Sequence, residues 1–384
     1  MNRFPKPRKK PHEIPGRVFL PGERIPIVSI ILLGVALFCL ILVWIARRSV
    51  SFAEFFNRRI SGFFRAFFAH ITNPLPFSFA ELLVLLTPLL IIILVVYAIR
   101  RKTASWRAVV SYLVSLLAGV SVIFTLFVFN YGIGYYVPTL DERLELDKQP
   151  VSAEELHETA LVLVDEINAL VPEIRYDTDG FSIMPYPLSE MGNKLMDAYA
   201  AFTEKHEYIQ DLNSNIKPVF LSVAMSYSHF TGFYTFFTGE ANLNVDFPDY
   251  TLPYTAAHEF AHQRGIAREN EANFIAFLVS LESDDPYIRY CGYLNLYEYV
   301  ASALYSADKT EGKTLYFDAR DRLDSSVLGE MSAYSAFYKK YSNSRAGAVG
   351  NSINNAFLQA NGAEEGSKSY GLVVDLAVAY YKDR

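Results

Sequence analysis

Three long apolar runs constrain most strongly what this 384-residue chain can fold into. Residues 25–46 contain no charged side chain, and comparable runs lie at about 80–99 and 108–130. About 20 helical residues cross the roughly 30 Å hydrocarbon core of a bilayer, so the runs predict three transmembrane helices. A cleaved signal peptide is the alternative for the first run, but that run is too long and lacks a small-x-small cleavage signal. The connector 51–70 mixes phenylalanines and arginines at helical spacing, which predicts an amphipathic helix in the membrane interface.

Charged residues are distributed unevenly along the chain. Residues 1–131 hold 16 basic and 4 acidic side chains, whereas residues 132–384 hold 19 basic and 37 acidic ones. This contrast indicates a basic part associated with a lipid bilayer, followed by an acidic, solvated part. We expect no nucleic-acid partner for the acidic part, because phosphate binding needs a basic surface. The two cysteines, Cys39 and Cys291, are too few for a disulfide framework or a cysteine-based zinc site.

The basic residues also predict the orientation in the membrane. Residues 1–24 carry seven of them, and the connection at 100–107 carries four, so the positive-inside rule places both in the cytoplasm. Five arginines after the first run oppose this assignment, whereas the stretch after the third run has almost no positive charge before Arg143. We therefore expect a multi-pass protein of the cytoplasmic membrane. Its parts are a cytoplasmic basic tail (1–24), a membrane domain (25–131) and an extracytoplasmic domain (132–384).

The extracytoplasmic part has mostly helical periodicity. Ser152 and Glu155 have the spacing of a capping box, which predicts that a helix begins there. In 236–247 apolar and polar residues alternate, which predicts a strand with one polar face. The helices expected in this part are 152–170, 187–207, about 253–263, 268–281, 286–306, 328–342 and 369–382.

Residues 258–262 read His-Glu-Phe-Ala-His, a pattern with a direct chemical consequence. On a helix His258 and His262 are four residues apart, so both imidazoles leave the same face and can bind one Zn²⁺. Glu259 then lies beside the metal without binding it, where it can accept a proton from water. Gly265 is a plausible C-cap for this helix.

A catalytic zinc site needs a third protein ligand, and the following helix offers two glutamates. Steps of three and four residues from Glu271 reach mostly apolar positions, so its carboxylate emerges on an apolar face and requires a cation or hydrogen-bond partners. The same steps from Glu269 reach smaller and more polar residues. We therefore prefer Glu271 as the ligand and keep Glu269 as the alternative.

Three short motifs carry a resemblance to a known family. They are HEFAHQRG at 258–265, TGEAN at 238–242 and EANF at 271–274. Together with the three N-terminal apolar runs, they resemble the bacterial membrane-protein family catalogued as domain of unknown function 3810, whose motif is similar to that of gluzincin peptidases. The resemblance implies an α-rich α+β zincin-like domain after the three-helix anchor, with His258, His262 and Glu271 as zinc ligands and Glu259 as general base.

The resemblance also raises three expectations outside the zinc ligands. Many gluzincins place an aspartate four residues after the ligand glutamate to orient a histidine, but that position is Ile275 here, so the partner of His258 is unassigned. The strand before the active helix usually pairs with an extended substrate, which makes substrate-binding candidates of Gly239, Glu240, Ala241 and Asn242; a half-exposed sheet edge is the alternative. Candidate transition-state stabilisers are His229, Tyr290, Tyr293 and Tyr370.

Two classes of function follow from these patterns. The first is a membrane-anchored zinc metallopeptidase, a hydrolase that cleaves a peptide or protein substrate of the bacterial cell envelope, with one Zn²⁺ ion and Glu259 as base. The second is a non-catalytic zinc-containing sensor or scaffold that signals through the transmembrane helices. The presence of Glu259 favours the enzyme, because a purely structural zinc site has no need of this residue.

Overall fold

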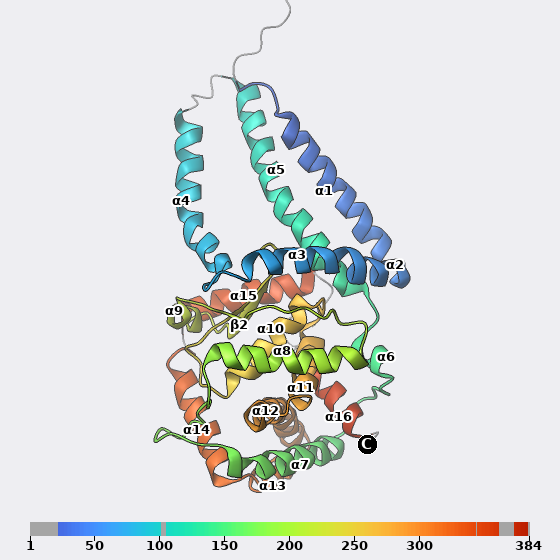
Figure 1. The fold of residues 1–384 in the computed structure, drawn as a ribbon, viewed down its shortest axis with the longest axis vertical. Helices are drawn as coiled ribbons and strands as arrows, with labels where there is room; N and C mark the ends of the chain where they lie inside the picture. The colour runs from blue at the N-terminus through green and yellow to red at the C-terminus, as the bar shows by residue number, and fades with distance from the viewer. Residues whose placement is uncertain (1–21, 101–104, 343, 361–371, 383–384) are drawn as a thin grey trace, which may run out of the picture. The chain divides into compact units, whose positions relative to one another are not determined.

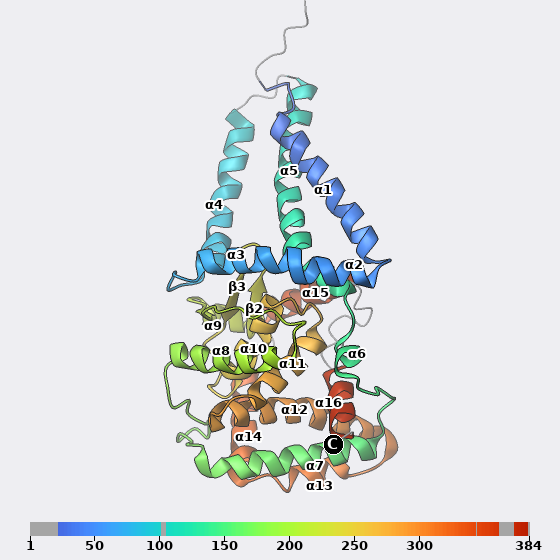
Figure 2. The same cartoon turned by 45° about the vertical axis from the view of Figure 1, so that its right-hand side comes forward.

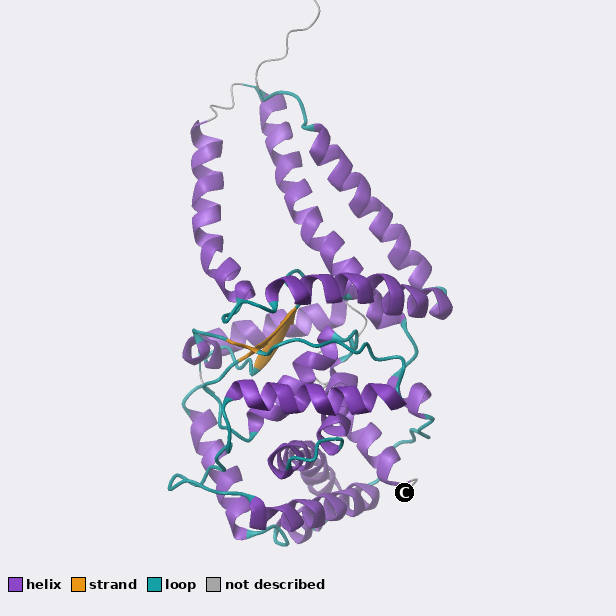
Figure 3. Ribbon diagram, in the orientation of Figure 1, coloured by secondary structure: helices purple, strands orange, loops and turns teal. Residues whose placement is uncertain are grey.

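The computed structural model describes residues 22–100, 105–342, 344–360 and 372–382, and these are predominantly helical with one small sheet (Figures 1 and 3). The helices before the sheet are α1 (Ile27–Ala46), α2 (Val50–Phe55), α3 (Gly62–Thr72), α4 (Phe79–Arg100), α5 (Trp106–Asn130), α6 (Leu140–Leu144), α7 (Ala153–Leu170) and α8 (Leu188–Lys205). The sheet region comprises β1 (Lys217–Pro218), α9 (Ser222–Ser226), β2 (Gly232–Thr235) and β3 (Glu240–Leu243). It is followed by α10 (Thr251–Gln263), α11 (Glu269–Leu281), α12 (Pro286–Glu311), α13 (Leu315–Arg320), α14 (Ser325–Lys339), α15 (Arg345–Ala360) and α16 (Val373–Lys382).

Three of the described helices, α1, α4 and α5, are long and apolar enough to cross a membrane. They coincide with the three apolar runs, so the prediction of three such helices near the N-terminus is confirmed. Pro88 lies inside α4 without ending it, as is tolerated in apolar helices of this kind. Most of their large apolar side chains are exposed, which is compatible with membrane association.

The described residues fall into two compact units. The smaller contains residues 22–38 and 88–124 apart from the undescribed loop at 101–104, and the larger contains 39–87 together with the described residues from 125 onward. The connector 51–70 therefore belongs to the larger unit. The physical reason is a set of buried polar contacts: Asn57 Nδ2 donates to Gly265 O at 3.1 Å, and Thr72 Oγ1 donates to Thr238 O at 3.2 Å.

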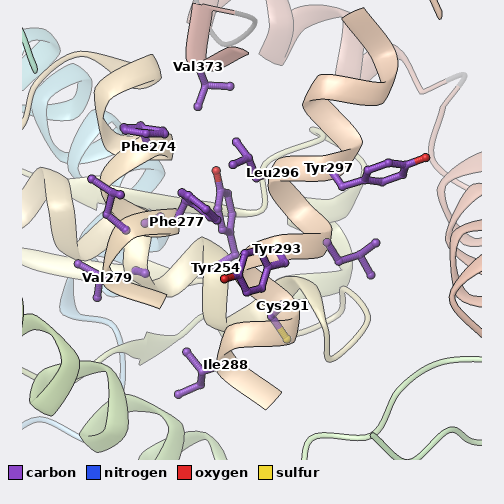
Figure 4. Packing of buried hydrophobic residues seen from close by; sticks show 14 of the residues in the cluster. Tyr254, Phe274, Phe277, Val279, Ile288, Cys291, Tyr293, Leu296, Tyr297 and Val373 are labelled. Atoms are coloured by element: carbon purple, nitrogen blue, oxygen red, sulfur yellow. The ribbon is translucent and has the colours of Figure 1, made fainter. Parts of the chain in front are cut away.

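The core of the larger unit is built by packing helices. α12 contacts α7, α10 and α11, and the buried side chains of these helices form one continuous apolar cluster (Figure 4). The capping box predicted for α7 is present, because the Ser152 hydroxyl accepts from Glu155 N while the Glu155 carboxylate accepts from Ser152 N. This cluster holds α10 and α11 against each other, which positions the site described below.

The sheet has three strands in the order β1-β3-β2, so β3 is its central strand. β1 pairs with β3 in parallel, and β2 pairs with β3 in antiparallel fashion. All four residues of β3 are buried, and the strand contacts α10 and α3. Figure 2 shows α3 next to β3. The predicted strand at 236–247 is therefore shorter than expected, and it is not a half-exposed edge.

Candidate metal centre

The end of α10 directs the chain from the His-Glu-Phe-Ala-His motif into α11. Gly265 has a φ of +103°, a left-handed conformation that favours glycine because it has no Cβ. Gly265 N donates to His262 O at 3.0 Å, and Ile266 N donates to Ala261 O at 3.1 Å, the hydrogen bonds of a Schellman-type helix end. The predicted C-cap is therefore confirmed, and the reversal brings the first residue of α11 back to the histidines of α10.

That first residue is Glu269, and its carboxylate meets both histidines. Glu269 Oε2 lies 3.1 Å from His258 Nε2 and 3.3 Å from His262 Nε2. The three ligand atoms lie within 4.8 Å of one another, and all three residues are buried. Two imidazole nitrogens and one carboxylate oxygen are the donor set of a catalytic zinc site with one open position. The described residues thus fit a zinc ion.

Glu271 does not face the histidines, which corrects our preference for it. Its Oε1 accepts from Leu140 N at 3.0 Å and from Arg268 Nη1 at 2.9 Å, so it joins α11 to the start of α6. The apolar face that favoured Glu271 is indeed buried, but every residue from Glu271 to Ser280 is buried too. Because α11 is buried on all sides from Glu271 onward, an apolar face does not show which glutamate points toward the histidines. The alternative ligand, Glu269, lies beside them.

Glu269 and His262 stabilise each other's charged forms when no metal is bound. Burial acts to raise the pKa of Glu269, but His262 and His258 together hold it far below its usual range. Burial also acts to lower the pKa of His262, yet the adjacent Glu269 raises it to about 9. Glu269 lies in the first turn of α11, where the helix dipole further favours a carboxylate.

The second ring nitrogen of His262 has partners that orient the imidazole. His262 Nδ1 lies 2.7 Å from Ile266 O and 3.1 Å from Tyr131 Oη, which in turn donates to Ala267 O at 3.0 Å. A carbonyl oxygen only accepts, so Nδ1 keeps its proton in the neutral ring, and loss of the other proton leaves the Nε2 lone pair for a metal. This is the tautomer that a metal ligand needs.

His258 has a different environment. Its Nδ1 is buried and has no hydrogen-bond partner among the described residues. With Glu269 in the ligand position, the residue four places later is Asn273 rather than Ile275. Asn273 is buried, and its Nδ2 also lacks a partner among the described residues. An amide therefore stands where many gluzincins have an aspartate.

Glu259 lies beside the cluster in a confined position. Its Oε2 is buried without a hydrogen-bond partner among the described residues, and the main-chain N–H of Tyr234 donates to its carboxylate. Burial raises the pKa of Glu259 to about 7, although His258 and His262 act to lower it. A Cβ at Gly232 would lie 2.7 Å from Glu259 Oε1, so any larger residue there would require this carboxylate to shift. A carboxyl that titrates near neutral pH has the property required of a general base.

A cavity of about 810 Å³ opens onto these side chains. β2 and the loop before it border one side, and residues of α12, α14 and α15 border the other. The sequence patterns did not predict α15 or β2, although Asn351, Asn354 and Phe357 of α15 line the cavity. Its size is within the range of small-molecule and peptide-binding clefts.

The candidate transition-state stabilisers have different locations. His229 lines the cavity, with its Nε2 2.9 Å from Tyr341 O. Tyr290 is buried elsewhere and donates to Glu330 Oε2 at 2.6 Å, and Tyr293 packs in the apolar core near Cys291 (Figure 4). Neither of these two tyrosines lines the cavity, so the structure does not place them with the site, and Tyr370 lies outside the described residues.

The four substrate-binding candidates are also not at the cavity. Glu240 accepts from Phe79 N at 3.0 Å and from Ala80 N at 2.8 Å, so its carboxylate caps the start of α4. Asn242 Oδ1 accepts from Ser78 Oγ at 2.6 Å, and Ala241 is fully buried. Gly239 has a φ of +71°, and a Cβ there would lie 2.6 Å from the main chain of α3. Because β3 is covered on both faces and both edges, these residues join the sheet to α3 and to the start of α4.

The residues that sequence reasoning missed are Tyr131, Gly232 and Tyr234. Tyr131 follows the third apolar run directly, and Gly232 lies in the unpredicted strand β2. A glycine within a strand pattern often marks close approach of another group, and that signal was available for Gly232. Nothing in the local sequence singles out Tyr131 or Tyr234 among the 26 tyrosines of the chain.

One comparison with known protein families bears on most of the chain. The family described as Protein of unknown function (DUF3810) matches residues 52–378, which include the connector, the sheet and every residue of the metal cluster. No curated protein and no solved structure matches the chain. By the extent of the family match, this chain belongs to the DUF3810 family.

Proposed function

We propose that this protein is a membrane-anchored, zinc-dependent peptidase. The observation that carries the proposal is the convergence of His258, His262 and Glu269 beside a carboxylate, Glu259, that has an unpartnered buried oxygen. Three N or O ligands with one open position are typical of catalytic zinc, whereas structural sites are usually closed by four protein ligands. The adjoining cavity supplies room for a substrate.

Glu259 has the main chemical role in this proposal. A Zn²⁺ ion held by His258, His262 and Glu269 would supply Lewis acidity for the attacking water and the substrate carbonyl. Glu259 accepts the proton that the attacking water loses and delivers it to the amine that leaves when the C–N bond breaks. The N–H of Tyr234 holds this carboxylate in place, and the absent side chain of Gly232 leaves space for it.

The edge of β2 is the proposed substrate track, in place of the strand that the sequence suggested. Asn244 N donates to Thr231 O at 2.9 Å, so these two residues form a hydrogen-bonded pair of the antiparallel ladder. Hydrogen-bonded and non-hydrogen-bonded pairs alternate along such a ladder. The main-chain N–H and C=O groups of Gly232 and Tyr234 therefore point away from β3. The N–H of Tyr234 donates to Glu259. The main-chain N–H and C=O of Gly232 can therefore pair with an extended peptide. A peptide bound there would pass beside Glu259.

The proposal places the protein in the cytoplasmic membrane of a bacterium, with residues 1–24 in the cytoplasm and the larger unit outside. Support comes from three helices with the length and apolarity of membrane spans and from the basic residues around them. The substrate class is then a peptide or protein of the cell envelope.

The decisive experiment compares the full chain with Glu259→Gln. Glutamine preserves volume and leaves the three ligands in place, so zinc content should stay near one ion per chain. Digestion of a diverse peptide library should fall by about 10⁴-fold or more, since general-base catalysis alone contributes roughly 10²- to 10⁴-fold. Glu190→Gln, an exposed carboxylate on α8, is the matched control and should retain activity. Zinc-loaded wild-type protein that cleaves no library member would instead support the sensor or scaffold.

A further inference from the structure

A second, smaller cavity of about 200 Å³ shares no lining residue with the first and is lined by four arginines among other residues. Arg58 and Arg59 come from the helical turn between α2 and α3, Arg65 comes from α3, and Arg264 directly follows α10. The other lining residues include two exposed acids, Glu207 and Asp211. The lining is therefore positive by two charges.

Two of these arginines are buried without an ion pair among the described residues, although the charge of Asp211 acts on Arg264 from a distance. Arg65 is 1% exposed and Arg264 is 2% exposed. No ion pair among the described residues involves either of them or Arg58 or Arg59. A buried cation is costly unless an anion accompanies it, so a region with two such cations is a natural place for an anion.

The hydrogen bonds of the buried arginines leave donor capacity unused. Arg65 donates to Asn57 Oδ1 and Asn57 O, each at 2.9 Å, and to Asn130 O at 3.3 Å, all of which are neutral acceptors. Arg264 likewise donates to neutral groups, including the carbonyls of Phe260 and Leu212. The Nε atom of each is buried and has no partner among the described residues. Burial lowers the pKa of both guanidinium groups to about 10, which leaves them charged at neutral pH.

The surroundings of the cavity identify the kind of anion. Arg58 and Arg59 are exposed at its border, and guanidinium groups match phosphate oxygens in geometry. The same connector exposes Phe63, Phe67 and Ile71, which form one apolar stripe along α3. A helix with an exposed apolar stripe and adjacent arginines is suited to the surface of a bilayer, where phosphate groups of lipids are abundant.

We propose that this cavity, lined by Arg58, Arg59, Arg65 and Arg264, binds a phosphate group, either free or in the headgroup of an anionic phospholipid. The site is independent of the zinc ion and of peptidase activity. It is adjacent to the turn after α10, because a Cβ at Gly265 would lie 2.6 Å from Arg65 Nη2.

The test measures binding of inorganic phosphate to the full chain in a non-ionic detergent by titration calorimetry. Wild-type protein should bind one phosphate per chain. The double variant Arg58→Gln/Arg59→Gln should raise the Kd by about tenfold or more, because charge-assisted hydrogen bonds to phosphate are lost. Both residues are exposed, so the variant should keep its helical circular dichroism signal.

Arg47→Gln/Arg48→Gln is the matched control, since it removes the same charge from exposed positions outside the cavity. Its Kd should stay within about twofold of wild type. Added phosphatidylglycerol distinguishes the two sources of the phosphate group. If the lipid weakens the binding of inorganic phosphate, the site takes a lipid headgroup. If inorganic phosphate binds equally well with the lipid present, the site takes free phosphate. Absence of saturable phosphate binding in wild type, or equal weakening in both double variants, would overturn the proposal.

Discussion

Glu269 Oε2 lies 3.3 Å from His262 Nε2, although the two residues belong to consecutive helices. The Gly265 turn makes this proximity possible, because it reverses the chain within a few residues. Glu269 consequently completes a three-residue cluster from two adjacent helices.

Zinc binding should depend on Glu269 and not on Glu271. Glu269→Gln should lower zinc affinity by at least about tenfold, because a ligand is lost. Glu271→Gln should retain zinc and reduce stability by about 1–3 kcal/mol, since the hydrogen bonds to Leu140 N and Arg268 are weakened. Metal analysis after equilibration with a zinc buffer, together with thermal unfolding, measures both effects. Loss of zinc only in Glu271→Gln would restore our preference from the sequence.

Gly232→Ala should reduce peptide cleavage without loss of zinc. The new Cβ would lie 2.7 Å from Glu259 Oε1 and 2.9 Å from Thr255 Cγ2, so the base must shift. A displacement of about 1 Å at a catalytic group can cost about 10²-fold in rate. Gly329→Ala in α14 is the control, because a Cβ there meets nothing within 4 Å and alanine favours a helix. A normal kcat in Gly232→Ala would contradict a catalytic role for Glu259.

Glu240→Gln should affect stability rather than substrate affinity. Its carboxylate accepts from Phe79 N and Ala80 N, and the loss of this charged cap should cost about 1 kcal/mol or more. Glu142→Gln, in the exposed capping box of α6, should have a smaller effect. Thermal unfolding and KM measured on the same samples distinguish the roles. An increased KM with an unchanged Tm would instead indicate that Glu240 binds the substrate.

Glu298 should make the protein less stable as pH rises from about 4.5 to about 7. Burial raises the pKa of Glu298 from 4.5 to about 7, despite a hydrogen bond from Tyr250 Oη. The folded state therefore keeps a proton that the unfolded state releases across this interval, and stability falls until the folded pKa is passed. Glu298→Gln should reduce this fall by an amount on the order of 1 kcal/mol. Tm measured against pH for both proteins without metal tests this, and parallel curves would contradict it.

The orientation in the membrane can be tested by cysteine labelling in intact cells. The Asp321 side chain is 71% exposed in the larger unit, so Asp321→Cys should react with an impermeant maleimide if that unit is outside. Lys9→Cys, in the basic tail, should react only after the cells are opened. The native Cys39 and Cys291 are buried, which keeps the background low. The opposite labelling pattern would reverse the proposed orientation.

The sequence by itself determined features that depend on neighbours along the chain. Helical rise and apolar length predict α1, α4 and α5, and the Ser152 capping box predicts the start of α7. The spacing of His258 and His262 places both imidazoles on one face of α10, and Gly265 predicts where that helix ends. These are local properties of a helix, so no tertiary contact is needed to infer them.

Only the tertiary structure decided which glutamate meets the histidines and which strand borders the cavity. α11 is buried on nearly all sides, so apolar periodicity cannot distinguish the direction of Glu269 from that of Glu271. The alternation in β3 resembles a half-exposed strand, but Glu240 and Asn242 are satisfied by α4 and its preceding loop, which lie more than 150 residues earlier in the chain. Periodicity reports how polar a face is, whereas the identity of the partner that covers that face depends on long-range packing.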